Sequence, residues 1–143
     1  MNILILHGPN LNLVGEREPS VYGHTTLAQI NEQLYSLAQE YNVNIRISQS
    51  NHEGVLIDTI HEFRMWADAL IINPGALTHY SYALRDAVSA FTKPVTEVHL
   101  SDLSKRESFR QISVFEGLPN VTRVMGKGVN GYYEALRTIA LQP

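Results

Sequence analysis

Five short apolar runs recur along this chain, and a segment with helical periodicity follows each of them. The runs are Ile3–Leu6, Val43–Ser48, Asp68–Ile72, Pro94–Leu100 and Val121–Met125. Strands that alternate with helices in this way are typical of a parallel sheet that helices cover. We therefore expect an α/β fold.

The helical segments predict how that sheet is covered. The first helix should begin near Thr26, whose hydroxyl would cap it while Gln29 reaches back to the Thr26 backbone. The others are expected at roughly Gly54–Trp66, Thr78–Phe91, a short piece around Leu103–Phe115, and Asn130–Ala140. No linker, repeat or low-complexity tract divides residues 1–143, so we expect a single domain, a flavodoxin-like three-layer sandwich with a five-stranded parallel sheet.

Composition narrows the class of protein. The 143 residues are 44% hydrophobic and 17% charged, as in a globular domain, and there is no cysteine for disulfides, thiol chemistry or zinc. A formal net charge of -3 suggests neither a nucleic-acid nor an anionic-membrane partner. No basic leader is present and no window approaches about 18 apolar residues. We expect a soluble cytoplasmic protein.

Polar residues follow the first four expected strands. Ligands bind beyond the carboxyl ends of the strands in such sheets, so these residues should surround a cleft. They are His7 with the segment Gly8–Gly23, then Gln49, Asn51, His52 and Glu53, then the segment Asn73–His79, and finally Glu97, His99 and Ser101. Together they favour a site for a polar small molecule.

The segment Gly8–Gly23 is long for a connection in a compact domain. Loops beyond about 12–15 residues are uncommon and tend to be active-site lids, binding loops or disordered segments. Its aliphatic residues would dock it onto the body of the protein, which favours a binding loop. It would place Asn10, Arg17 and Tyr22 on one mobile loop.

Tyr22 is a candidate general base. With its ordinary pKa near 10, a tyrosine is only about 0.1% ionised at neutral pH. One or two arginines could supply the roughly 4 kcal/mol that a shift of about three units requires. Arg17 lies five residues earlier on the same loop. Without such a pairing, Tyr22 would be a packing aromatic, and Arg17 and Asn10 solvated loop residues.

His99 is a candidate catalytic residue, because it lies at the carboxyl end of an expected central strand. Glu97 lies two residues earlier and should point to the same side, where it could orient the imidazole. The alternative is a buried histidine with only a hydrogen-bonding role.

Two further features have both a functional and a structural interpretation. The turn Asn73–Gly75 would offer free N–H groups to an anion such as a carboxylate, although Asn73 would serve equally well as a helix N-cap. Arg106 and Arg110 would share one face of a helix, but they could also be a solvated face paired with Glu107.

Other motifs carry less weight. Gly126–Gly131 matches G-x-G-x-x-G but follows the last strand, with no further βαβ unit and no acidic residue on a next strand, so a dinucleotide site is not expected. The six histidines lack HExxH or H-x-H spacing, so no metal site is expected.

With these residues in place, nearly the whole chain resembles the type II 3-dehydroquinate dehydratases, the small dehydroquinases of the shikimate pathway. Several blocks match in the family's order, which argues against coincidence. They are His7–Pro19 with Tyr22-Gly23, Gln49–Gly54, Ile72–His79, Ala83–Ala87, Pro94–Ser101, and Arg106-Glu107 with Phe109-Arg110.

The resemblance implies a hydro-lyase that works without metal, Schiff base or other cofactor. It would remove water from 3-dehydroquinate by anti elimination, through an enolate, to give 3-dehydroshikimate. Tyr22 would take the proton alpha to the ketone while Arg17 holds it as phenolate. Asn10 would help to stabilise the enolate oxygen through an ordered water, and His99 would protonate the departing hydroxyl.

The resemblance also implies a set of substrate ligands. The ligands are Asn73, Leu100 and Ser101 for the carboxylate, and His79, Arg110 and Asp86 for the ring hydroxyls, with Asp86 from a neighbouring subunit of a homododecamer. The loop with Arg17 and Tyr22 would close over the substrate and exclude water.

The chain departs from the family pattern late in the sequence. The departures are Asp102–Lys105, Gln111-Ile112 and Phe115–Asn120, together with the bulky Tyr80 and Tyr82. None removes an implied catalytic group, so subunit packing and inhibitor preference are the properties they would affect.

Two alternative functions belong to other classes. A flavodoxin-like binding module would need a hydroxyl-rich phosphate cradle after the first strand, and that cradle is missing. A catalytically inactive homologue used for assembly is disfavoured by the intact set of Asn10, Arg17, Tyr22 and His99.

Overall fold

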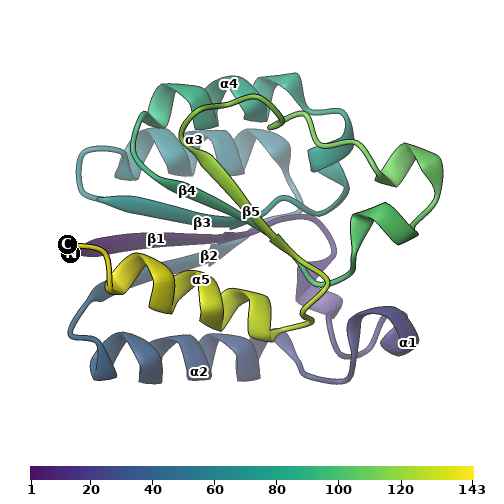
Figure 1. The fold of residues 1–143 in the computed structure, drawn as a ribbon, viewed down its shortest axis with the longest axis horizontal. Coiled ribbons are helices and arrows are strands. Elements are labelled where there is room, and N and C mark those ends of the chain that lie inside the picture. Colours follow the sequence, from purple (N-terminus) through teal and green to yellow (C-terminus); the bar gives the residue numbers. More distant parts are fainter.

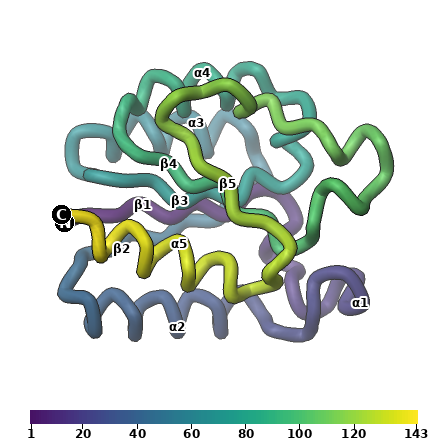
Figure 2. Tube along the Cα trace, viewed as in Figure 1, coloured from purple at the N-terminus to yellow at the C-terminus, as the bar shows by residue number.

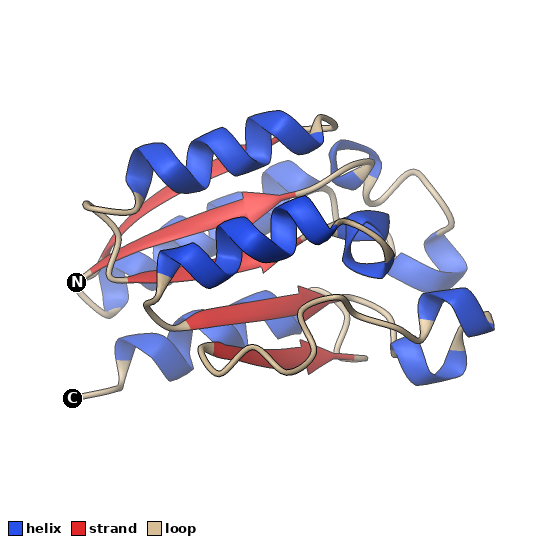
Figure 3. Ribbon diagram, turned by 90° about the horizontal axis from the view of Figure 1, so that it is seen from above, coloured by secondary structure: helices blue, strands red, loops and turns tan.

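The structure is a computed structural model that describes all residues 1–143. Its strands are β1 (Asn2–His7), β2 (Asn44–Gln49), β3 (Ala69–Asn73), β4 (Val95–His99) and β5 (Val121–Met125). Every neighbouring pair is parallel, in the order β2-β1-β3-β4-β5, and the arrows in Figure 3 all point one way. The expected five-stranded flavodoxin-like sheet is confirmed.

Helices form the outer two layers of the sandwich. They are α1 (Pro19–Tyr22), α2 (Leu27–Glu40), α3 (Glu53–Phe63), α4 (Tyr82–Phe91) and α5 (Asn130–Ala140), with single 3-10 turns at η1 (Leu11–Leu13), η2 (Gly75–His79), η3 (Leu103–Lys105) and η4 (Ser108–Arg110). Figure 1 shows α3 and α4 on one face of the sheet and α2 and α5 on the other. No helix has the length and apolar character needed to cross a membrane.

The apolar runs are continuous because the sheet is buried on both faces. Successive side chains of β1 point to opposite sides. Ile3 and Ile5 enter the core beneath α2 and α5, whereas Leu4 and Leu6 enter the core beneath α3 and α4. All four are at most 1% exposed. Two separate cores therefore hold the helices against one sheet.

Local signals placed most element ends correctly. The capping box is present, since the Thr26 hydroxyl accepts from the Gln29 N–H and the Gln29 side chain accepts from the Thr26 N–H. The helix Asn130–Ala140 has the expected bounds. The helix expected from Thr78 begins instead at Tyr82, because the Ser81 hydroxyl caps it by accepting from the Leu84 N–H.

The short helix expected around Leu103–Phe115 is wrong. The segment forms only the single turns η3 and η4, with Arg106 extended between them. Polar bonds outside any helix hold it: Gln111 Nε2 donates to the Arg106 carbonyl, and the Val114 N–H donates to the Thr78 carbonyl. Arg106 and Arg110 therefore do not share a helix face.

The carboxyl ends of the strands lie at one end of the molecule. Both chain termini lie at the opposite end, where they overlap in the view of Figure 2 but stand apart in Figure 3. The α1 loop and the segment with η3 and η4 meet beside the strand ends, where Arg106 donates to Tyr22 across 84 residues of sequence.

Candidate active site

A cavity of about 160 Å³ lies beyond the carboxyl ends of β1, β3 and β4. Strand order reverses between β1 and β3, which is where ligands bind in open α/β sheets. Nine of the ten residues for which a catalytic or substrate-binding role was predicted line it. They are Asn10, Arg17, Tyr22, Asn73, His79, His99, Leu100, Ser101 and Arg110.

The base of the Gly8–Gly23 loop is held firmly. Asn10 has a left-handed backbone with φ of 68°, a conformation that asparagine tolerates better than most residues. Its N–H donates to Asn51 Oδ1 at 2.9 Å, and Gln49 Nε2 donates to the Gly8 carbonyl at 3.2 Å. Gln49 and Asn51, which were expected to line the cleft, instead support the loop from outside the cavity.

The loop also packs closely on the turn that follows β3. A Cβ added to Gly8 would lie 2.5 Å from the Pro74 carbonyl oxygen, so only glycine allows this approach. Leu11 and Val14 are buried, as the docking of the loop requires. Asn10 and Asn73 are thereby brought to one cavity.

Tyr22 lies between two arginines. Arg106 Nη1 donates to the Tyr22 oxygen at 3.1 Å and to Ser101 Oγ at 3.1 Å. Arg17 lies over the ring, 5.4 Å from its centroid, and pairs with Glu18 at 3.3 Å. The hydrogen bond to Tyr22 raises the pKa of Arg106 more than partial burial lowers it. The guanidinium at the phenol oxygen is therefore that of Arg106.

His99 is anchored by Glu97. His99 Nε2 lies 2.7 Å from Glu97 Oε1, and the carboxylate is fully buried. Although burial alone would raise it, the hydrogen bond and charge of His99, with help from Thr78 and Arg123, hold the pKa of Glu97 at about 2. An ionised carboxylate only accepts, so Nε2 carries a proton and Nδ1 is left for a ligand.

Asn73 ends β3 and is fixed from behind. Its Oδ1 accepts from the Gly75 N–H at 3.1 Å. Burial raises the pKa of Tyr132 despite its hydrogen bond with Asn73, and the Tyr132 hydroxyl lies 2.8 Å from His7 Nδ1. Burial also lowers the pKa of His7 to about 4, although its Nε2 donates a hydrogen bond to Asn31 Oδ1 at 2.9 Å. The Gly75 N–H thus fixes the Asn73 amide, and His7 and Tyr132 form a buried pair of neutral groups beside it.

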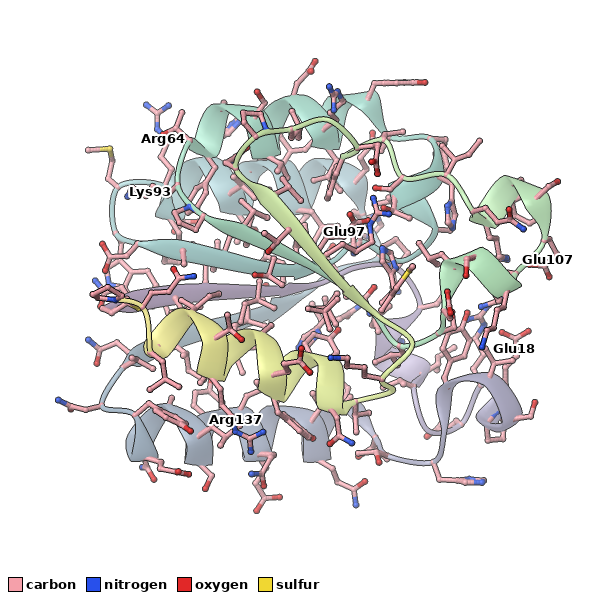
Figure 4. All side chains as sticks on the ribbon, viewed as in Figure 1. Glu18, Arg64, Lys93, Glu97, Glu107 and Arg137 are labelled. Carbon is pink, nitrogen blue, oxygen red and sulfur yellow. The ribbon has the colours of Figure 1, made fainter.

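His79 and Arg110 complete the far wall. His79 Nδ1 donates to the Ile112 carbonyl at 2.7 Å, which leaves its Nε2 for another partner. Arg110 Nε lies 3.0 Å from Glu107 Oε2, and Figure 4 shows Glu107 at the outer edge of the molecule. No group of three or more histidine, aspartate or glutamate side chains is arranged to hold a metal ion.

Comparison with known proteins agrees with this geometry. The sequence profile of the family described as Dehydroquinase class II matches residues 1–140. The chain belongs to this family.

Individual relatives extend the match over whole chains. The 3-dehydroquinate dehydratase of Dictyoglomus turgidum is 53% identical over 141 residues, covering 99% of this chain and 97% of the relative. That of Pelotomaculum thermopropionicum is 55% identical over 140 residues, covering 98% and 96%. A type II dehydroquinase structure from Butyrivibrio crossotus superposes with a TM-score of 0.93 at 40% identity, covering 97% of each chain.

Two residues of this class II dehydroquinase need separate comment. Asp86, which was expected to act in a neighbouring subunit, does not line the cavity of its own chain and lies exposed on α4. Arg106 lines the cavity, although no role in the site was predicted for it. The sequence offered two signals for Arg106: its spacing from Arg110, which rested on a helix that does not form, and its place in a block that resembles the family.

Proposed function

We propose that this chain is a 3-dehydroquinate dehydratase that eliminates water in the anti sense, through an enolate, to give 3-dehydroshikimate. Membership of the class II dehydroquinase family supports the reaction. The observation that carries the proposal is the contact of Arg106 with the Tyr22 oxygen in a cavity that also contains His99. A base and an acid from different elements then face one substrate.

In the first step Tyr22 acts as the base. Its phenolate takes the proton alpha to the ketone, and the electron pair moves onto the ketone oxygen as an enolate. Arg106 at the phenol oxygen and Arg17 over the ring favour the ionised form. Asn10 helps to stabilise the enolate oxygen through an ordered water.

In the second step His99 acts as the acid. The enolate re-forms the carbonyl, the carbon–carbon double bond forms, and the carbon–oxygen bond to the hydroxyl breaks. The hydroxyl leaves as water with the proton from Nδ1 of the His99 imidazolium. Glu97 at Nε2 stabilises that imidazolium and fixes its orientation. No step requires a metal or cofactor.

The substrate is held by groups already in place around the cavity. Its carboxylate binds Asn73 and the backbone of Leu100 and Ser101. His79 and Arg110 hold ring hydroxyls. Substrate contact on both sides would draw the loop with Tyr22 down and exclude water, which strengthens these electrostatic interactions.

Asp86 is assigned to the site of a neighbouring subunit in a homododecamer. Its exposure on α4, outside the cavity of its own chain, supports this assignment. Large apolar side chains are exposed nearby at Tyr80, Tyr82, Phe109 and Ile112, as a subunit contact would require. Each subunit would be a single catalytic domain spanning residues 1–143, working in the shikimate pathway in the cytoplasm.

The test is the ultraviolet absorbance of the conjugated enone. Purified protein mixed with 3-dehydroquinate should generate the signal, and treatment with borohydride in the presence of substrate should leave it intact, because no lysine imine forms. Tyr22→Phe should lower kcat by at least about 100-fold. Tyr35→Phe, an exposed tyrosine on α2, is the matched control. An active wild-type protein with an equally active Tyr22→Phe variant would contradict the assignment of the base.

A further inference from the structure

Glu97 is the most heavily coordinated side chain near the site. It has no exposed surface, and Figure 4 shows it inside the fold beside β5. The hydroxyls of Thr78 and Ser113 donate to the carboxylate, Ser113 at 2.9 Å to Oε1. His99 Nε2 binds Oε1, and Arg123 Nε donates to Oε2 at 3.0 Å. One buried carboxylate is thus shared between an imidazole and a guanidinium.

Arg123 comes from the edge strand and lies outside the substrate cavity. It stands directly opposite Glu97 in the β4–β5 register. Its side chain is 25% exposed, and its Nη2 donates to Glu116 Oε2 at 3.0 Å. Burial alone would lower the pKa of Arg123, but the charge and hydrogen bond of Glu97 raise it. A charge relay therefore runs from the surface at Glu116 through Arg123 to Glu97 and His99.

The division of the Glu97 charge has a consequence for proton transfer. A carboxylate bound only to imidazolium would hold the proton on His99 tightly, whereas a guanidinium on the other oxygen draws off part of that negative charge. We propose that Arg123 is a positioning residue that keeps Glu97 ionised and makes the His99 imidazolium a stronger acid, with Glu116 moderating the effect from the surface. This role rests on the proposed function of His99 as the general acid.

Other charged groups also lie close to Glu97 and His99, and the test must leave these groups unchanged. His79 on η2 interacts electrostatically with His99 and Glu97, and also with Arg110 on η4. Arg106 lines the same cavity. None of these groups contacts Arg123 or Glu116, so substitutions at the surface end of the relay leave them in place.

Two substitutions should act with opposite sign. In Arg123→Gln the imidazolium keeps its proton to higher pH, so the alkaline limb of the kcat profile should move up by about one pH unit, and kcat at pH 7 should fall about three- to tenfold with little change in KM. In Glu116→Gln the Arg123 charge is less compensated, so the limb should move down by about a few tenths of a unit. Arg123→Lys should stay close to wild type.

The matched controls are Arg137→Gln and Glu134→Gln on α5, which remove the same charges. Figure 4 shows Arg137 away from Glu97, and Glu134 pairs with Lys127. The second readout is the NMR titration of the His99 imidazole in protein labelled on histidine, which needs no turnover. In each variant, the midpoint of this titration should shift in the same direction as the alkaline limb of the kcat profile. If wild-type protein failed to turn over 3-dehydroquinate, this titration would still decide the relay.

Opposite shifts for Arg123→Gln and Glu116→Gln, absent from both controls, would establish the role. Unchanged limbs and unchanged His99 titration in folded variants would overturn it, as would shifts of the same sign. Should Arg123→Gln fail to fold, Glu116→Gln decides alone, because Glu116 is 79% exposed and its loss leaves the core intact; an unmoved His99 titration in that variant would then reject the relay.

Discussion

The contact between Arg106 and Tyr22 predicts a change in the pH dependence of turnover. Arg106→Gln removes a guanidinium whose Nη1 lies 3.1 Å from the Tyr22 oxygen. Two unit charges about 4 Å apart interact by about 4 kcal/mol at an effective dielectric constant of about 20. Because Tyr22 is only half-buried beside an open cavity, solvent screening should leave about half of that, so we take about 2 kcal/mol as the lost stabilisation of the phenolate.

That energy converts into two measurable quantities. A tenfold change in rate corresponds to about 1.4 kcal/mol, so a loss of about 2 kcal/mol should lower kcat at pH 7 about 30-fold. The base must lose its proton to act, so the acid-side limb of the kcat profile should also move to higher pH. Arg17→Gln should move the limb less, because Arg17 lies over the ring rather than at the oxygen.

The assay is enone formation at saturating 3-dehydroquinate from about pH 5 to about pH 10. Arg106→Lys keeps the charge and should retain most of the wild-type limb position, although it loses the second bond to Ser101. A limb that stays in place in folded Arg106→Gln, or one that moves further in Arg17→Gln, would refute the assignment of Arg106 as the principal partner of the phenolate.

Three further predictions concern groups behind the cavity. Burial lowers the pKa of His7 to about 4, so between about pH 6.5 and about pH 4 the unfolded chain binds a proton that the folded protein does not. The free energy of unfolding, measured in guanidinium titrations, should therefore fall by about 3 kcal/mol as the pH is lowered through that window. A free energy of unfolding that does not change with pH there would contradict the buried neutral state. Tyr132→Phe removes a buried hydroxyl that binds His7 Nδ1 and lies beside Asn73, so KM should rise several-fold, by about 1 kcal/mol, with kcat nearly kept. In thermal melts, Gly8→Ala should destabilise the fold by about 2 kcal/mol or more, because its Cβ would clash with the turn after β3, and it should also lower activity. Gly54→Ala, which has open space around its Cβ, should be neutral or stabilising in the same assay.

The fold was predictable where the residues of one segment determine the structure of that segment. The Thr26 and Gln29 side chains cap a helix whose start they define locally, and the five apolar runs became the five strands. The helix expected from Thr78 starts four residues late, at the Ser81 cap, because Thr78 uses its hydroxyl on Glu97 and its carbonyl on Val114, partners that come from other parts of the chain. Local periodicity contains no information about such partners.

The candidate site also has a part that the sequence predicted and a part that it did not. The rule that ligands gather beyond strand ends predicted that Asn10, Asn73 and His99 would share a cavity, and they do. It failed at the end of β2, because β2 is the edge strand next to β1 and its polar residues turn to support the loop instead. Strand order decides which strand ends border the cavity, and the residues of a single apolar run do not determine that order.

The sequence by itself determined the layers of this protein, its family and most of the side chains that line the cavity, because hydrophobic period, capping and motif order are properties of neighbouring residues. Only the tertiary structure decided which charges face each other. Arg106 reaches Tyr22 across 84 residues, and Arg123 reaches Glu97 across 26. The strength of an ion pair depends on distance and burial, and both quantities exist only after the helices and loops have packed against the sheet.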